Sequence, residues 1–260
     1  MKVDFKIRVS VLLTFILMIA VNILANAIPI NGVTTAEVAD FYANLFTPAP
    51  ITFAIWGLIY LLLFGYTIYQ FIYKGRNITA QLMNRIGIYF LISSLSNAAW
   101  ILCWHYFKIP FSMICMLLIL ICLIKIASEN AKMQFSLKEW FFIRLPFSIY
   151  FGWITVATIA NVATLLVYLK WDGFGISEVI WTVIAVSLGA IIGILTMLLY
   201  RDMAYGFAVI WGFIGILIKQ LSPSGFQGEY KAIILTVSVA ILLLFIAEVY
   251  LFLSKLRMKK

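Results

Sequence analysis

Long apolar runs separated by short polar segments set the pattern of the chain. Eight of these runs are long enough to cross a bilayer, because about 20 helical residues span roughly 30 Å of hydrocarbon. Lipid offers no partner for a backbone N–H or C=O group, so each run is predicted to be a helix. The pattern therefore indicates an all-α, polytopic membrane helix bundle of about eight transmembrane helices. The runs cover residues 9–28, 51–73, 86–105, 111–127, 146–169, 178–200, 204–221 and 232–254.

Composition supports this fold class and excludes a water-soluble protein. Of the 260 residues, 65% are hydrophobic and 11% are charged, and the mean hydropathy is +1.08. A soluble globule of this size has too little interior for so many apolar side chains, so most of them must face lipid or other membrane helices. The bilayer is therefore the first expected partner. Nucleic acid is not expected, since no soluble basic module accompanies the net charge of +9.

The distribution of basic residues predicts the orientation. Cytoplasmic segments of membrane proteins hold the excess of Lys and Arg. With eight spans and both termini in the cytoplasm, fifteen of the nineteen basic residues fall on the inner side. We therefore expect a multi-pass protein of the cell membrane with the 30–50 and 222–230 loops outside. The four outer basic residues are Lys108, Lys170, Lys219 and Lys231.

The first apolar run has two interpretations. A basic start, an apolar stretch and the small residues Ala25 and Ala27 are compatible with a cleaved signal peptide. Asn22 and Asn26 lie one turn apart on one helix face, which favours a retained helix that packs against partners. We favour the retained helix.

The segment LFTPAPITFAIWGLIY at 45–60 carries the first candidate chemistry. Pro48 and Pro50 stiffen the end of the predicted outer loop and start the second helix. Phe53, Trp56 and Tyr60 then recur on one helix face. One interpretation is an aromatic belt at the level of the lipid headgroups. The other is a ring-lined pocket beneath a proline-stiffened lid.

Two further segments carry motifs that, together with the 45–60 segment, are similar to those of a known family. Asn97 and Trp100 form an N-x-x-W pattern in the third run, and Trp153, Ala157 and Asn161 form a W-x-x-x-A-x-x-x-N pattern in the fifth. With the 45–60 segment, they resemble the translocator protein family, also called tryptophan-rich sensory proteins (TspO/MBR). The resemblance covers about residues 9–170. It implies a five-helix bundle over 1–170, with 171–260 as an additional three-helix membrane segment.

The resemblance also implies a site. Trp153, Ala157 and Asn161 match the family's ligand-facing residues. With the other matched positions, they give the candidate ligand-binding residues Pro48, Pro50, Phe53, Trp56, Tyr60, Asn97, Trp100, Trp153, Ala157 and Asn161. The tryptophans that usually flank the double proline are absent, and the family's acidic residue in the fourth helix is replaced around Cys115 and Met116. These departures count against porphyrin chemistry of the kind reported for some members.

Three functions remain open at this point. The favoured one is a sensor or carrier that binds a flat apolar ligand, such as a tetrapyrrole or another lipophile, in an aromatic-lined pocket. The alternatives are a small-molecule transporter or permease and a tetrapyrrole-modifying enzyme. The sequence shows no nucleophile with a base, no paired carboxylates and no metal cluster, so no catalytic or metal-binding residues are assigned and an enzyme is disfavoured. Self-association into a homodimer is left open.

Two ionisable residues within the runs are treated as structural. Glu248 is expected to reach toward the cytoplasmic face or to pair with Arg201. His105 is expected to hydrogen-bond near the membrane interface rather than to ligate haem iron.

Gly189 and Gly193 form a G-x-x-x-G pattern, which is typical of a helix-packing face.

Overall fold

All eight predicted runs are helices in the computed structural model, which describes residues 2–257 and contains no strand within that range. The shorter elements are η1 (Ile30–Gly32), α2 (Thr35–Phe41), η2 (Pro50–Ala54), α6 (Leu137–Glu139), the π-helical η3 (Trp140–Arg144) and η4 (Gly173–Gly175). The spans are α1 (Phe5–Ala27), α3 (Ile55–Ile72), α4 (Asn77–His105), α5 (Ile109–Ala131), α7 (Leu145–Tyr168), α8 (Glu178–Tyr200), α9 (Met203–Leu221) and α10 (Lys231–Arg257).

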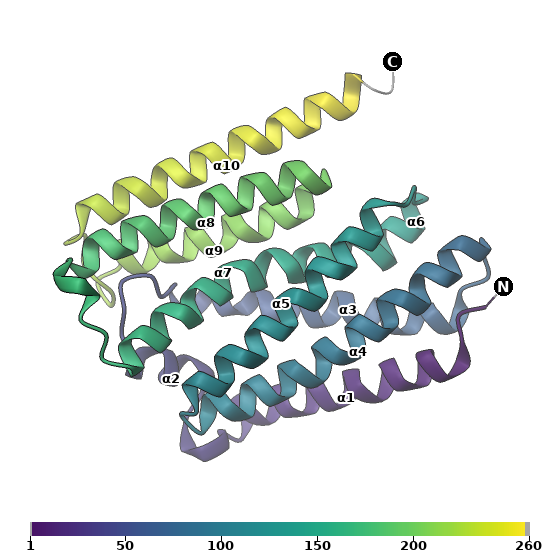
Figure 1. Ribbon diagram of the computed structural model, residues 1–260, viewed down its shortest axis with the longest axis horizontal. Coiled ribbons are helices and arrows are strands. Elements are labelled where there is room, and N and C mark those ends of the chain that lie inside the picture. Colours follow the sequence, from purple (N-terminus) through teal and green to yellow (C-terminus); the bar gives the residue numbers. More distant parts are fainter. Residues whose placement is uncertain (1, 258–260) are drawn as a thin grey trace.

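The helices form one elongated bundle (Figure 1). α8, α9 and α10 lie along one side, α1 and α4 lie along the opposite side, and α3, α5 and α7 lie between them. The two ends of the chain lie at the same end of the bundle, which we call the terminal end. The opposite end, called the lid end, carries the long connection between α1 and α3 that contains α2.

Interlocking rings hold the centre of the bundle together. Tyr66 of α3, Phe90 of α4 and Phe147 of α7 are fully buried or nearly so, and each ring meets the other two edge-on at centroid distances of 4.8 to 5.7 Å. Such edge-to-face pairs contribute roughly 0.5–1.5 kcal/mol each beyond the area that they bury. Three helices are thereby fixed against one another beneath the predicted pocket.

α9 is the most buried span because its glycines allow close packing. In the most apolar 18-residue stretch of α9, 61% of the residues are buried, which is the largest share among the eight spans of the described chain. A side chain at Gly212 would collide with Val156 of α7, and one at Gly206 would collide with Met197 of α8 and Glu248 of α10. The short, glycine-rich run at 204–221 is therefore a central helix with neighbours on several sides.

The G-x-x-x-G pattern in α8 also packs as predicted. Gly189 faces Ile159 of α7 and Phe213 of α9, and Gly193 faces Val209 of α9 and Leu244 of α10. The additional helices therefore share one core with α7. The boundary at residue 170 remains a prediction about domain organisation.

The fifth span begins earlier than the predicted residue 146. Its helix starts at Leu137, where Ser136 and Glu139 form a capping box, and continues through the π-helical η3 into α7. Pro146 lies in the first turn of α7, where its missing N–H removes one backbone hydrogen bond. The wider π turn just before the proline allows the helix to continue through this position.

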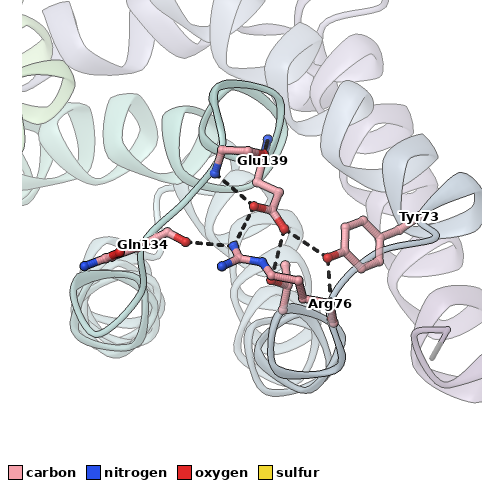
Figure 2. Close-up of polar contacts among 6 residues, drawn as sticks. Tyr73, Arg76, Gln134 and Glu139 are labelled. Atoms are coloured by element: carbon pink, nitrogen blue, oxygen red, sulfur yellow. Dashed lines mark hydrogen bonds and ion pairs between the residues drawn. The ribbon is translucent and has the colours of Figure 1, made fainter.

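A buried carboxylate joins two connections at the terminal end (Figure 2). Glu139 accepts hydrogen bonds from the Tyr73 hydroxyl at 2.9 Å, from Thr79 at 3.0 Å and from the Ser136 backbone N–H at 2.9 Å, and it pairs with Arg76 at 2.7 Å. The Arg76 guanidinium also donates to the carbonyl of Gln134 at 2.7 Å. A phenol is protonated at neutral pH at its ordinary pKa, and burial raises the pKa of Tyr73 further, so its hydroxyl is a hydrogen-bond donor here. The α3–α4 and α5–α7 connections are thus tied together.

Replacing Glu139 by glutamine should lower the melting temperature of the detergent-solubilised protein. Several donors would lose a charged acceptor, which costs about 1–3 kcal/mol for a buried group. Glu129→Gln is the matched control, because the Glu129 side chain is more exposed than that of Glu139, 19% against 7%, and exposed ion pairs contribute about 0–1 kcal/mol. Equal melting temperatures for the two variants would contradict the structural role of Glu139.

Candidate functional site

The rings predicted from the sequence converge near the lid end of the bundle. Trp56 lies among four other rings, with centroid distances of 5.3 Å to Tyr60, 6.4 Å to Trp100, 5.8 Å to Tyr150 and 6.2 Å to Trp153. Phe53 meets Trp153 edge-on at 5.8 Å. We call Phe53, Trp56, Tyr60, Trp100, Tyr150 and Trp153 the aromatic cluster. These rings pack against each other across α3, α4 and α7, which does not fit a lipid-facing belt.

Two hollows flank the cluster. The inner cavity has a volume of about 40 Å³ and is lined by Trp153, Ala157 and Asn161 of α7 together with Pro48. The second cavity has a volume of about 400 Å³ and is lined by Asn22, Pro50 and Tyr60. A further set of residues lines both cavities and separates them. This set consists of Thr35, Phe53, Trp56 and Trp100.

The structure therefore brings nine of the ten predicted site residues to the two cavities. The exception is Asn97, which lies behind the cavity walls. It is fully buried and links Asn22 of α1 to Tyr150 of α7. Thr35 and Tyr150 were not predicted from the sequence, although Thr35 lines both cavities and Tyr150 contacts Trp56.

One chain of hydrogen bonds runs behind the cluster across four helices. The Tyr60 hydroxyl donates to Asn22 at 2.6 Å, the Asn22 amide donates to Asn97 at 2.8 Å, and the Asn97 amide donates to the Tyr150 hydroxyl at 3.2 Å. Asn22 is thus buried against α4, and retention of the first helix remains a prediction. The side chain of Asn26 lies outside the described residues.

A second chain of hydrogen bonds holds the Trp100 ring in place. The Trp100 indole N–H donates to Asn161 at 2.9 Å, and the Asn161 amide donates to Ser112 of α5 at 3.3 Å. Asn97 and Asn161 therefore both face the bundle interior, as predicted. Each amide holds one ring of the aromatic cluster, because Asn97 bonds Tyr150 and Asn161 bonds Trp100.

Asn161→Leu should lower the melting temperature by an amount corresponding to roughly 1–3 kcal/mol, because the Trp100 indole N–H would remain buried without an acceptor. Thr236→Leu is the control, since Thr236 lies on the exposed side of α10 and bonds only its own helix. A melting temperature of Asn161→Leu equal to that of the control would show that Trp100 does not depend on this amide.

The connection between α1 and α3 forms the lid, defined here as residues 30–54. The outer loop expected at 30–50 contains a short helix, α2, that was not predicted from hydropathy. Its signal was nevertheless in the sequence, because Thr34 and Glu37 have the spacing of a capping box and form one. Pro48 is buried over the inner cavity, and Pro50 opens the η2 turn that leads into α3.

α8 and α9 hold the lid in place. The Leu45 N–H donates to Glu178 of α8 at 3.0 Å, and its carbonyl accepts from Gln220 of α9 at 2.8 Å. Closer to the aromatic cluster, the Ala49 N–H donates to the Gly215 carbonyl at 2.9 Å, and the Trp211 indole donates to the Thr52 carbonyl at 2.9 Å. These contacts were missed because each joins residues more than 130 positions apart, and no local motif signals them.

His105 ties the start of the lid to α4. The side chain is fully buried, with Nε2 at 3.1 Å from the Thr35 hydroxyl and Nδ1 at 3.2 Å from the Ile30 carbonyl. The Asn31 amide donates to the His105 carbonyl at 3.0 Å. The hydrogen-bonding role predicted for His105 is confirmed, and the side chain is buried beneath the lid.

The prediction for Glu248 is wrong. Its side chain neither reaches the surface nor bonds to Arg201. It is 2% exposed and lies against Gly206 and Met197, and neither carboxylate oxygen has a hydrogen-bond partner among the described residues. The close approach of α9 to α10 at Gly206 encloses the carboxyl group before it can extend toward the terminal end.

Comparison with known proteins supports the resemblance. The model of a family described as TSPO-like protein matches residues 8–250. The matched range extends beyond residue 170 and includes α8, α9 and most of α10. No curated protein and no solved structure gives a significant match.

Proposed function

Since the chain belongs to the TSPO-like protein family, we propose that this membrane protein binds a flat apolar ligand in the aromatic cluster, as a sensor or ligand carrier. A tetrapyrrole or another planar lipophile has the required shape. The ring faces provide stacking surfaces, and the amides behind them keep these faces in position.

The observation that carries the proposal is an unsatisfied donor in the wall of the inner cavity. The Trp153 indole N–H is buried and has no hydrogen-bond partner among the described residues, although its ring lines the cavity. Buried donors are almost always paired, so an orphaned donor at a cavity wall calls for an explanation. A ligand with a polar edge would provide the missing acceptor.

Binding requires the rings to move. The inner cavity of about 40 Å³ is far below the roughly 300–1,000 Å³ of small-molecule sites, whereas the neighbouring cavity of about 400 Å³ falls within that range. Phe53, Trp56 and Trp100 separate the two hollows. Displacement of Trp56 would join them into one site between the lid and Ala157.

Titration of the purified protein tests this function. Intrinsic tryptophan fluorescence should be quenched saturably by one class of flat ligand among tetrapyrroles, carotenoids and sterols. A carrier or sensor would bind without moving ligand across proteoliposomes, whereas the alternative transporter would produce flux. Absence of saturable quenching by all three classes would count against the proposal.

We further propose that the lid faces the outside of the cell, because most basic residues lie toward the terminal end. Asn44 lies in the predicted outer loop, but its side chain is buried, so it is unsuitable for cysteine labelling. In a variant lacking the three native cysteines, Ser224→Cys should react with an impermeant thiol reagent in intact cells, and Lys132→Cys should be protected. Both positions are exposed, so the reverse pattern would invert the orientation.

A further inference from the structure

A larger groove lies on the other side of α7 from the aromatic cluster. Its volume is about 650 Å³, and it runs between the lid-end halves of α7 and α8. Apolar side chains form its walls, and several of them are exposed where the bundle would face lipid. Representative wall residues are Val162, Ala163 and Leu166 of α7 and Ile184, Ala185 and Leu188 of α8. The groove is separate from the cavities of the aromatic cluster and its role does not depend on the proposed function.

Rings gather at the mouth of the groove. Trp171 and Trp181 line it, with centroids 4.9 Å apart and planes inclined by 58°. Phe174 meets Trp171 edge-on at 5.4 Å. The Trp181 indole is held in place by its hydrogen bond to the Gly173 carbonyl at 3.0 Å. Inclined aromatic faces of this kind attract ammonium groups, and most strongly those carried by tryptophan.

The same mouth contains charges of both signs. One carboxylate oxygen of Asp172 accepts a hydrogen bond from the Phe174 N–H at 3.0 Å. One carboxylate oxygen of Glu178 likewise accepts from the Leu45 N–H at 3.0 Å. Within residues 2–257 the second oxygen of each carboxylate accepts no hydrogen bond, and Lys170 forms no ion pair. One ammonium group and one phosphate group would therefore complement the mouth.

We propose that this groove binds one zwitterionic phospholipid with an ammonium headgroup, taken from the leaflet at the lid end. An acyl chain lies between α7 and α8, the ammonium group lies among the tryptophan rings and the two carboxylates, and the phosphate lies near Lys170. A glycerol headgroup has no cation for the rings or the carboxylates and brings a net negative charge toward them. The groove therefore distinguishes headgroups as well as accepting apolar chains.

Photolabelling in nanodiscs tests the assignment. The full chain is reconstituted in equal parts of phosphatidylcholine and phosphatidylglycerol, with a diazirine in the acyl chain of one lipid or the other. The choline probe should label the 159–167 and 184–188 segments at least about threefold more than the glycerol probe, as a cation–π contribution of modest size requires. The exposed residues 242, 243, 245 and 246 of α10 serve as the internal control and should show no preference.

Two sets of variants separate headgroup recognition from chain binding. Asp172→Asn combined with Glu178→Gln should remove the preference for choline, and Ala163→Phe or Ala185→Phe should reduce labelling of the groove by both probes. Leu242→Phe on α10 is the control for added bulk, and melting temperatures report whether each variant folds. Equal labelling by the two probes in the unmodified protein, or preference for the glycerol probe, would overturn the proposal whatever the variants show.

Discussion

Trp153→Ala and Trp56→Ala should each weaken binding of a flat ligand about tenfold or more. Tenfold corresponds to about 1.4 kcal/mol. A stacking contact contributes roughly 0.5–1.5 kcal/mol beyond area burial, and loss of the buried ring area adds to this. Trp153 should show the larger effect, because its variant also removes the orphaned indole N–H. Fluorescence or absorbance titration with the bound ligand class measures both dissociation constants.

Trp153→Phe and Trp140→Phe serve as the controls for this pair. The first keeps an aromatic face while removing the indole N–H, so it isolates the contribution of that donor. The second changes a tryptophan of η3, which lies outside the aromatic cluster and outside the lid. Melting temperatures must be compared as well, since Trp→Ala at a buried position costs about 3–5 kcal/mol of stability. Undiminished affinity in folded Trp56→Ala and Trp153→Ala would place the ligand elsewhere.

Gly215→Val should release the lid and accelerate ligand dissociation by roughly ten- to hundredfold. A side chain at this position would collide with the side chain of Thr52, including its Cβ, so the lid backbone must move. The hydrogen bond from the Ala49 N–H to the Gly215 carbonyl and the one from the Trp211 indole to the Thr52 carbonyl would be lost together. Each contributes about 0.5–1.5 kcal/mol to holding the lid. Stopped-flow displacement of bound ligand measures the dissociation rate constant.

The matched control is Gly57→Val. Gly57 lies in α3 close to the lid, but a side chain there would meet no neighbouring atom. Its dissociation rate constant should stay close to that of the unmodified protein. If Gly215→Val behaves like Gly57→Val, the contacts of Gly215 and Trp211 do not govern access to the site, and the lid must be held by other contacts, such as those of His105 and Glu178.

Much of this architecture could be predicted from local sequence, and the missing parts have physical causes. Hydropathy located the spans because the bilayer imposes one length and one polarity on each of them. Helical spacing placed Trp153, Ala157 and Asn161 on one cavity wall, because residues four apart share a helix face. The contacts of the lid with Glu178 and Gln220 depend on how distant helices pack, and no spacing rule encodes them.

The burial of Glu248 and the volumes of the cavities also depend on how distant helices pack. A carboxyl group nine residues before the end of α10 could reach the terminal end, and only the approach of α9 at Gly206 prevents this. Likewise, the sequence predicted a pocket between tryptophans, whereas its volume depends on the orientation of the Trp56 ring. Both features follow from packing between helices rather than from the pattern along one of them.

The most direct test of the central claim is a tetrapyrrole titration of the unmodified protein beside Ala157→Leu and Ala232→Leu. Ala157 lines the inner cavity next to Trp153, and leucine there would fill the space that a flat ring needs. Ala232 lies on the exposed surface of α10, so Ala232→Leu adds the same bulk away from the site. We expect saturable quenching in the unmodified protein and in Ala232→Leu, and loss of quenching in a folded Ala157→Leu. Quenching of equal affinity in all three proteins would contradict it.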